Sequence, residues 1–353
     1  MFQQILSHTF SRWVGLFFGL ALLILCFLGS IKLGLTQIDW KSLWEAYGAT
    51  DPTKEQLIVI STRFPRALIA VCVGASLAIA GAFMQALTQN PLASPGILGI
   101  NAGAVLFVVL ASGYLSISSY SALTWVAFLG AAISGGIVYG LSTLGRGGLT
   151  PLKLTLAGAA ITAFFHTLTQ GVLIINEKTL DEILYWMSGS IVGRKLDHLV
   201  DVLPFFLVAW VLALLITRPI NTLVMGDSVA KGLGQRTGWV KLLTAAVVIL
   251  LAGGSVAIAG PISLVGLVIP HLARSLVGSN YQWIIPYSAV LGGIFLLLAD
   301  IGARYLIMPG GPIIELLSGL GSQSLSDEVP VGVITALIGV PFFIYIARRS
   351  IKE

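Results

Sequence analysis

The sequence is dominated by apolar stretches, each about 20 residues long, that are separated by charged residues or by prolines and glycines. An α-helix needs about 20 residues to cross the hydrocarbon core of a bilayer, whereas a membrane β-barrel would alternate apolar and polar residues. Only 10% of the residues are charged and 56% are hydrophobic, while soluble domains carry about 25% charged residues. These features predict an all-α, polytopic membrane protein embedded in the lipid bilayer.

The breaks between the apolar stretches predict about ten transmembrane helices within a single transmembrane domain. Their expected ranges are 14–35, 66–88, 97–113, 122–143, 151–175, 198–217, 240–259, 262–277, 284–303 and 330–347. The third and the eighth are short. Ten crossings place both termini on the same side, and a weak excess of Lys and Arg in the inner segments favours the cytoplasmic side.

One short phrase occurs twice: Ser76 to Gly81 reads SLAIAG, and Ser255 to Gly260 reads SVAIAG, 179 residues later. The same offset superposes Pro91 on Pro270 and Gly99 on Gly278. The copies lie in predicted spans two and seven, which cross in opposite directions because five spans separate them. This parity predicts an inverted repeat of spans 2–5 and 7–10, the plan of many transporters.

Basic residues gather at the expected outer ends of spans two and nine. Arg63 and Arg66 flank Pro65, which suits the first turn of a helix, and Arg304 follows Asp300 by four residues. These arginines could anchor the helices at the interface, and Asp300 could form an i,i+4 ion pair with Arg304. Alternatively, the three arginines form a basic ring that binds carboxylates of an external partner.

The longest inner loop, 218–241, contains the sequence GDSVAKGLG. Asp227 follows a glycine and is expected to be the N-cap of a short helix, and the glycines would end that helix. The loop is either a plain surface helix or a docking surface for a soluble partner. The docking residues would be Gly226, Asp227, Ala230, Lys231 and Gly234.

The chain is expected to break at the inner end of span two, between Gln85 and Pro95. Asn90, Pro91 and Pro95 interrupt the helix there, and Pro270 belongs to the matching segment of the repeat. Irregular backbone at membrane depth is tolerated only where protein or a water-filled cavity covers it. These five residues are therefore candidates for the lining or the gate of a translocation pathway.

Several function classes lack their motifs. No G-x-x-x-x-G-K-[ST] loop occurs, so the chain cannot be its own ATPase, and no Cys/His cluster has metal-ligand spacing. No catalytic residues, metal site, cofactor or nucleic-acid partner are expected. Carboxylates within the spans are nearly absent, apart from Asp300, which disfavours an ion-coupled secondary transporter. An intramembrane enzyme is disfavoured because no nucleophile–base pair can be assembled.

A set of motifs, found in order along nearly the whole chain from about residue 60, resembles the FecCD-type permeases. These motifs are Arg63-Phe64-Pro65-Arg66, Gln85 to Gly99, Gly226-Asp227 with Ala230, Gly260 to Arg274, Ala299-Asp300 with Ala303-Arg304, and Val329 to Gly332 with Gly339 to Phe343. Members of this family are the membrane subunits of ABC importers for iron–siderophores, haem and vitamin B12.

The resemblance implies a ten-helix permease in a bacterial cell membrane. It would pair with a second permease subunit, identical or paralogous, around a shared pathway. Two cytoplasmic ATPase subunits would dock on the loop from Gly226 to Gly234. An extracytoplasmic substrate-binding protein would place glutamates on Arg63, Arg66 and Arg304. The implied cargo is a ferric siderophore, with haem or vitamin B12 as alternatives, carried by alternating access.

One segment departs from the family pattern. The stretch 305–328 is about twice the usual length between the two last motifs and is rich in glycine and serine. This outer insertion lies beside Arg304 in the sequence. It could alter docking, act as a lid, or be a tolerated surface loop.

Overall fold

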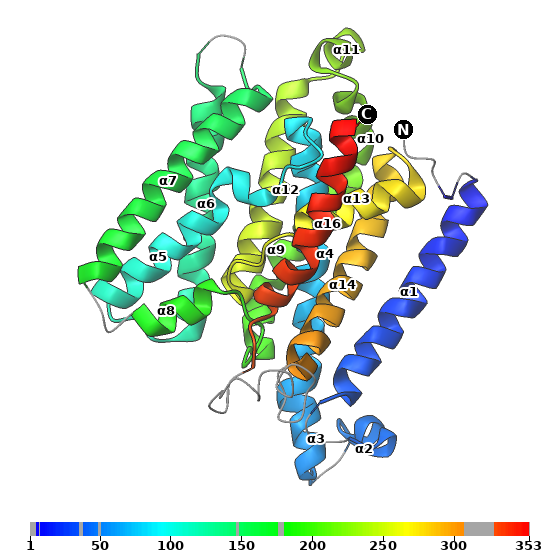
Figure 1. Ribbon diagram of the computed structural model, residues 1–353, viewed down its shortest axis with the longest axis vertical. Coiled ribbons are helices and arrows are strands. Elements are labelled where there is room, and N and C mark those ends of the chain that lie inside the picture. The colour runs from blue at the N-terminus through cyan, green and yellow to red at the C-terminus, as the bar shows by residue number, and fades with distance from the viewer. Residues whose placement is uncertain are drawn as a thin grey trace.

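A computed structural model of the chain describes residues 5–6, 8–34, 38–48, 51–145, 148–175, 180–306 and 328–352. The regular structure of this part is entirely helical (Figure 1). The helices of the first half are α1 (Thr9–Lys32), α2 (Trp40–Glu45), α3 (Lys54–Ile58), α4 (Phe64–Thr88), α5 (Ile100–Tyr114), α6 (Tyr120–Thr143), α7 (Pro151–Ile175) and α8 (Leu180–Met187). Those of the second half are α9 (Leu196–Leu215), α10 (Thr217–Val224), α11 (Asp227–Gly232), α12 (Thr237–Ala259), α13 (Val265–Val277), α14 (Tyr281–Leu306) and α16 (Val331–Lys352).

Seven helical segments in the described residues are long and apolar enough to cross a membrane. They are Thr9–Lys32, Lys54–Thr88, Tyr120–Thr143, Pro151–Ile175, Leu196–Leu215, Thr237–Ala259 and Tyr281–Tyr305. Three shorter apolar helical stretches are Ile100–Tyr114, Val265–Val277 and Val331–Phe342. The all-α polytopic class is therefore confirmed.

The second segment begins earlier than its sequence predicted, at Lys54 instead of residue 66. Thr53 starts it with a capping box, in which Thr53 Oγ1 accepts the Gln56 N–H at 3.4 Å and Gln56 Oε1 accepts the Thr53 N–H at 2.9 Å. A π-helical turn, η1 (Val59–Arg63), joins α3 to α4. Such a turn suits a proline, because Pro65 has no N–H for an i→i−4 bond and its ring crowds the preceding turn.

Pro65 thus lies in the first turn of α4, as the sequence predicted, but the helical backbone of α3 and η1 continues directly into α4. Arg63 and Arg66 lie within a continuous helix of 35 residues, well beyond its first turn. The positive end of the helix dipole acts only over that first turn. Repulsion by the dipole thus gives no reason for these arginines to seek an external anion.

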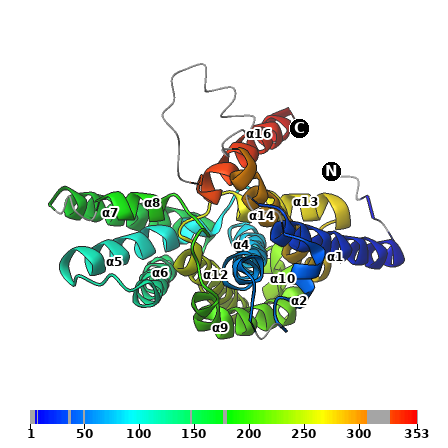
Figure 2. The ribbon, with the colours of Figure 1, turned by 90° about the horizontal axis from the view of Figure 1, so that it is seen from below.

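Helix α4 forms the centre of the fold (Figure 2). In the span Lys54–Thr88, which contains it, 89% of the most apolar 18-residue stretch is buried. Helix α4 packs against α13 and α14 of the second half, while α12, its repeat partner, packs against α5 and α6 of the first half. Each half of the inverted repeat thus inserts one helix into the other half. The repeated phrases lie in these two exchanged helices, and their serines, Ser76 and Ser255, are both buried.

Small residues allow this exchange because they let helix backbones approach closely. A Cβ atom added to Gly81 of α4 would lie 1.8 Å from the carbonyl oxygen of Gly266 in α13. Likewise, a Cβ on Gly74 would lie 2.3 Å from the carbonyl oxygen of Gly292 in α14. Gly74 and Gly81 therefore allow α4 to cross α14 and α13 at close distance in the core.

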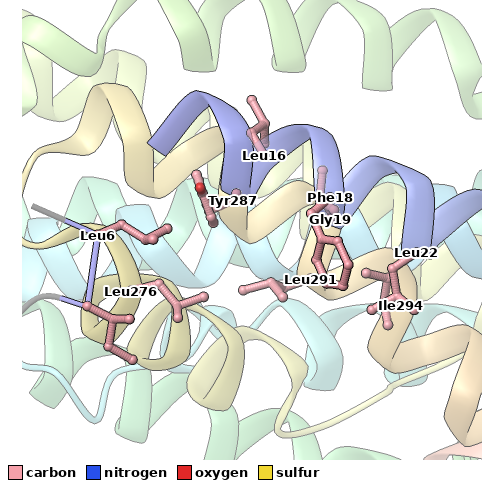
Figure 3. A pocket seen from close by; sticks show the side chains of 12 residues that line it. Leu6, Leu16, Phe18, Gly19, Leu22, Leu276, Tyr287, Leu291 and Ile294 are labelled. Carbon is pink, nitrogen blue, oxygen red and sulfur yellow. The ribbon is translucent and has the colours of Figure 1, made fainter. Parts of the chain in front are cut away.

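Helix α1 packs on α14 at the periphery and leaves an apolar groove of about 300 Å³ between them (Figure 3). Leu16 and Leu22 line it from α1, and Leu291 and Ile294 line it from α14. The Tyr287 hydroxyl also borders the groove, but it donates a hydrogen bond to the Arg12 carbonyl oxygen at 2.6 Å. The lining is thus apolar.

Both termini lie at the end of the molecule that carries α11, and α2 and α3 lie at the opposite end (Figure 1). The predicted outer insertion, 305–328, falls outside the described residues except for Tyr305, Leu306 and Glu328.

Candidate functional site

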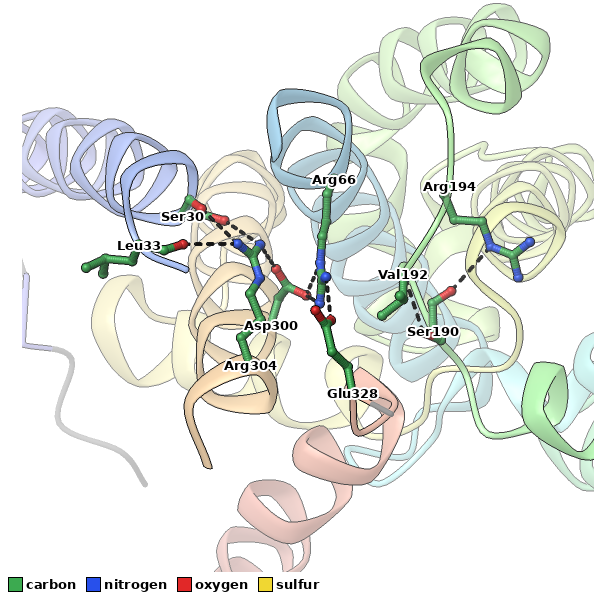
Figure 4. A network of polar contacts seen from close by, with 9 residues as sticks. All are labelled: Ser30, Leu33, Arg66, Ser190, Val192, Arg194, Asp300, Arg304 and Glu328. Atoms are coloured by element: carbon green, nitrogen blue, oxygen red, sulfur yellow. Dashed lines mark hydrogen bonds and ion pairs between the residues drawn. The ribbon is translucent and has the colours of Figure 1, made fainter. Parts of the chain in front are cut away.

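An arginine–carboxylate cluster lies where α4 and α14 run side by side, and Figure 4 shows its members Arg66, Asp300, Arg304 and Glu328. Arg63 of η1 is its fifth member, close enough to Arg304 to interact electrostatically with it. Arg66 Nε and Nη2 lie 2.8 Å and 2.7 Å from Asp300 Oδ1. Asp300 Oδ2 pairs with Arg304, one helical turn further along α14. The predicted i,i+4 pair between Asp300 and Arg304 thus exists, and Arg66 extends it across helices.

The cluster also binds the end of α1. Arg63 Nη1 donates to the carbonyl oxygens of Ile31 and Lys32, both at 2.9 Å. Arg304 Nη1 donates to the Ser30 carbonyl oxygen at 2.9 Å, and its Nη2 donates to Ser30 Oγ at 3.0 Å. The last carbonyls of a helix lack partners within it and carry partial negative charge. The two guanidinium groups satisfy that end of α1.

Burial distinguishes the two carboxylates. Asp300 is fully buried, and the three arginines are only 5–8% exposed. The Glu328 side chain is 35% exposed, and its Oε2 lies 2.6 Å from Arg66 Nη1. The structure therefore brings the three predicted arginines together, but it binds each of them to groups within the chain. Glu328 and Ser30 were missed by the sequence analysis, since only the fold brings them to the arginines.

The opposite end carries the short helix α11, whose N-cap is Gly226 with φ of +117°. The expectation that Asp227 caps this helix is wrong, because its carboxylate makes no capping bond. It pairs instead with Lys231 Nζ and Lys241 Nζ, both at 2.8 Å. These hydrogen-bonded ammonium groups lower the pKa of Asp227 to about 2. The pair with Lys241 ties α11 to α12.

The helix ends as predicted, at glycines: α11 stops at Gly232, and Gly234 adopts φ of +80°. Ala230 is fully buried, and Lys231 faces solvent. Gln235 closes the turn, donating from Nε2 to the Pro219 carbonyl oxygen of α10 at 2.8 Å. Together, α10, α11 and Gln235 form one hydrogen-bonded unit, which we call the α10–α11 unit.

Large apolar side chains on and beside this unit are exposed. Met225 is 69% exposed, Leu233 70% and Trp239 62%, with Val229 at 47%. Scattered exposed apolar residues are common, but a group of them on one short segment marks an interaction surface.

The predicted break follows α4 at the same end. Gln89 ends the helix in the left-handed conformation (φ 48°), and Asn90 Oδ1 accepts the Leu92 N–H at 2.9 Å, forming a tight turn. Asn90 and Pro91 are exposed. The structure therefore places them in a turn at the surface of the chain.

The other three predicted gate residues are buried around the crossing of α4 and α13. Gln85 is 3% exposed, and its Nε2 donates to the Leu267 carbonyl oxygen at 3.2 Å. Pro95 packs at Gly266, where its Cδ would lie 2.9 Å from an added Cβ. Pro270 is buried within α13. These residues hold helices of the two halves together.

Comparison with known proteins decides the family. The model of the FecCD transport family matches residues 22–349 of the chain. The chain belongs to the FecCD transport family.

Two curated relatives from Bacillus subtilis (strain 168) match over nearly the full length. The protein named "Probable siderophore transport system permease protein YfiZ" is 51% identical, covering 99% of this chain and 100% of its own. The Fe(3+)-citrate import system permease protein YfmD is 43% identical, covering 94% of each. A solved metal-chelate type ABC transporter in an inward-facing conformation has a TM-score of 0.80 at 28% identity, covering 95% of this chain and 98% of its own.

Membership of the FecCD transport family makes this chain a membrane transport subunit and not an enzyme. Among the described residues, no group of three or more His, Cys, Asp or Glu side chains could hold a metal ion. One end of the described structure thus carries the arginine–carboxylate cluster, and the other carries the exposed apolar side chains of the α10–α11 unit.

Proposed function

We propose that the chain is the permease subunit of an ABC importer for a ferric siderophore, with haem or vitamin B12 as alternative cargoes. The observation that carries this proposal is the 51% identity, over 99% of the chain, to the protein named "Probable siderophore transport system permease protein YfiZ". In this proposal, partner ATPases drive alternating access, and the chain itself makes and breaks no covalent bonds. The protein resides in a bacterial cell membrane.

The α10–α11 unit is the proposed docking site for the ATPases. Its exposed apolar residues suit the core of a protein interface, where apolar side chains are desolvated. The pair of Asp227 with Lys241 keeps α11 attached to α12, so a push on α11 reaches a membrane helix. Since both termini share this end, both would be cytoplasmic.

The arginine–carboxylate cluster is the proposed docking site for the substrate-binding protein. Arg63, Arg66 and Arg304 outnumber the carboxylates Asp300 and Glu328, which leaves a formal charge of +1 in the cluster. Asp300 is locked between two arginines, but Glu328 is partly exposed and bonded to one. A carboxylate of the binding protein could therefore replace Glu328 on Arg66 without opening the core.

A second permease subunit is proposed to cover α7. Only 22% of the most apolar 18-residue stretch of this helix is buried. Three polar residues of the helix, His166, Thr167 and Gln170, are exposed. Polar side chains within a membrane span face a protein partner or a water-filled cavity, since lipid cannot satisfy them. This face suits the pathway between two permease subunits, whereas the apolar groove beside α1 does not suit a polar chelate. Asn90 and Pro91 would then lie at its inner opening.

An ion-coupled carrier is the alternative that Asp300 could have supported. In the structure, one oxygen of this buried carboxylate pairs with Arg66 and the other pairs with Arg304. This arrangement leaves neither oxygen open to a coupling ion. The structure thus favours energy from ATP.

Uptake and binding measurements test the proposal together. The cognate binding protein should be stabilised against heat by one ferric siderophore in a panel that includes haem and cobalamin. Cells that carry the importer should take up that ⁵⁵Fe-labelled compound until ATP is depleted. Uptake that survives ATP depletion but collapses with an ionophore would rule out the ABC importer. Stabilisation by haem or cobalamin alone would change the cargo.

A further inference from the structure

A chain of side-chain hydrogen bonds connects the α10–α11 unit to the inner end of α4. It starts at Asn221 on α10, whose Nδ2 donates to Asn280 Oδ1 at 2.9 Å and whose Oδ1 accepts the Tyr281 N–H at 2.8 Å. These bonds attach α10 to the first residue of α14. Asn221 and Asn280 belong to none of the motifs singled out in the sequence.

The chain of contacts continues through Arg274 of α13. Its Nη2 donates to the Tyr281 hydroxyl at 3.1 Å, and its guanidinium carbon lies 5.8 Å from the centre of the Tyr281 ring. Its Nη1 donates to Gln85 Oε1 of α4. Tyr281 itself stacks on Phe83 of α4, with ring centres 6.5 Å apart.

Gln85 completes the connection. One side of its amide accepts from Arg274, and the other donates to the Leu267 carbonyl oxygen. The residue is buried, four positions before the turn at Gln89 that ends α4. Each hydrogen bond from Asn221 to Gln85 therefore joins two different helices, or joins a helix to a segment that connects two helices. These hydrogen bonds are partly buried, and hydrogen bonds in a network shielded from water depend on one another and specify one arrangement of the groups.

We propose that Asn221, Tyr281, Arg274 and Gln85 form a transmission latch, which passes movement of the α10–α11 unit to the inner end of α4 and the turn at 89–92. The latch rests on the proposed function, because its input is the docked ATPase. Its residues are positioning residues, because each acts through its contacts with other groups of the chain. In the sequence, Arg274 is the last residue of one of the family motifs, and its inward bonds to Gln85 and Tyr281 give it this further role.

A transmission latch and a contact that only stabilises the fold can be distinguished by the effect of removing them. A structural tie lowers stability, while a transmission element leaves the input movement intact and abolishes the output. Coupling through a packed network needs such a direct test, because adjacency alone does not establish it. Both movements can be measured without knowing the cargo.

The experiment uses the permease assembled with its own ATPase subunits, with Cys26 and Cys72 replaced. Spin labels at Ser228 on α11 and at Leu92 in the turn are each paired with a reference label at Leu141 on α6. Distances are measured by pulsed electron paramagnetic resonance, before and after trapping with ATP and vanadate. Ser228, Leu92 and Leu141 are exposed.

In the otherwise unchanged chain, both distances should shift on trapping. In Asn221→Ala and in Gln85→Ala, the Ser228 shift should persist, while the Leu92 shift should fall below half. Tyr281→Phe removes one hydroxyl but keeps the ring on Phe83, so it should fold and show a partial loss. Gln282→Ala removes an exposed amide beside the latch, outside the bonded chain, and should change neither shift.

A full Leu92 shift in Asn221→Ala and Gln85→Ala would overturn the latch. So would an equal loss in Gln282→Ala, since general loosening of this region would then explain the result. If either alanine variant fails to assemble, Tyr281→Phe decides: an unchanged Leu92 shift there overturns the proposal. Absence of a Ser228 shift in the unchanged chain would instead contradict ATPase docking on α11, which is the proposed function.

Discussion

At the residue scale, Asp300 connects the members of the arginine–carboxylate cluster. It is fully buried and forms ion pairs with both Arg66 and Arg304. Removing one partner of a buried ion pair leaves charge without compensation and costs about 3–5 kcal/mol. Asp300→Ala should lower the free energy of unfolding by that amount, measured by thermal unfolding of the purified permease.

Glu328 provides the matched control, since it binds the same Arg66 from a partly exposed position. A partly exposed ion pair contributes up to about 1 kcal/mol, so Glu328→Gln should cost no more than that. If the two variants lose equal free energy of unfolding, the difference in burial between Asp300 and Glu328 does not determine how much each stabilises the fold.

Glu328 also yields a prediction about docking. If its carboxylate occupies the place on Arg66 that a binding protein would take, Glu328→Gln frees that place. The dissociation constant of the binding protein should then fall by roughly two- to fivefold, the equivalent of one exposed ion pair. Surface plasmon resonance at low salt measures it. Weaker binding by the variant would mean that Glu328 contacts the partner itself.

Charge reversal of the arginines is a poorer test of docking. Arg66 neutralises Asp300, and Arg63 binds the end of α1, so replacing either by glutamate places a second negative charge in the core or removes a helix cap. Loss of uptake in such a variant would report loss of the fold as readily as loss of docking.

Asp227 gives a prediction about pH. Its pKa is lowered to about 2 in the folded chain from an ordinary value of 3.8. Because the folded pKa is the lower one, the stabilising effect is complete above pH 3.8 and disappears as pH falls towards 2. Asp227→Asn should accelerate amide exchange in residues 227–232 by the same factor at every pH from 7 to 5. A factor that already declines between pH 7 and 5 would contradict the lowered pKa.

At the scale of the helices, the crossing of α4 with α13 has no room for a side chain larger than that of glycine. Gly81→Ala would place a methyl group 1.8 Å from the Gly266 carbonyl oxygen, so a backbone must move. Overpacking a core costs about 1–3 kcal/mol and more where backbones meet. The yield of folded permease, measured by fluorescence-detected gel filtration, should fall severalfold. Gly136→Ala is the control, since nothing lies within 4 Å of the Cβ added on α6; its yield should not fall.

Helix positions followed from the sequence where apolar length decides them. The short third and eighth spans correspond to α5 with 15 residues and α13 with 13. The start of the second helix did not follow, because Lys54, Glu55 and Arg63 end the apolar run without ending the helix. The capping box at Thr53 and the π-helical turn η1 extend the helix in this region. Neither feature is visible in the hydropathy of the sequence, from which the span was predicted.

At the scale of the whole molecule, the exchange of α4 and α12 makes the two halves interdependent. A chain divided after Gly193, in the α8–α9 connection, separates each exchanged helix from its packing partners. Gly193 has open space around it, so the cut itself should be tolerated. Either fragment alone should be degraded, while co-expression should restore most of the permease, as measured by membrane-fraction immunoblots. Stable accumulation of a single fragment would contradict this interdependence.

The inverted repeat was predictable because parity of the spans requires no knowledge of contacts. The gathering of Arg63, Arg66 and Arg304 was predictable from the family resemblance. The partners of these arginines were not predictable. Ser30 binds Arg304, and Glu328 binds Arg66, and more than 30 residues of sequence separate the members of each pair. Asn221 was equally hidden, since an asparagine in a loop has no signature until the fold gives it Tyr281 and Asn280.

Helix α4 is held at both ends, through Arg66 to Asp300 outside and through Gln85 to α13 inside. About 28 Å of straight helix separates these two points, and close backbones on two sides leave it no room to bend. In the proposed importer, displacement of one end of α4 would therefore displace the whole helix. A partner bound at one surface would then affect the other surface on the microsecond to millisecond timescale of rigid-body motion.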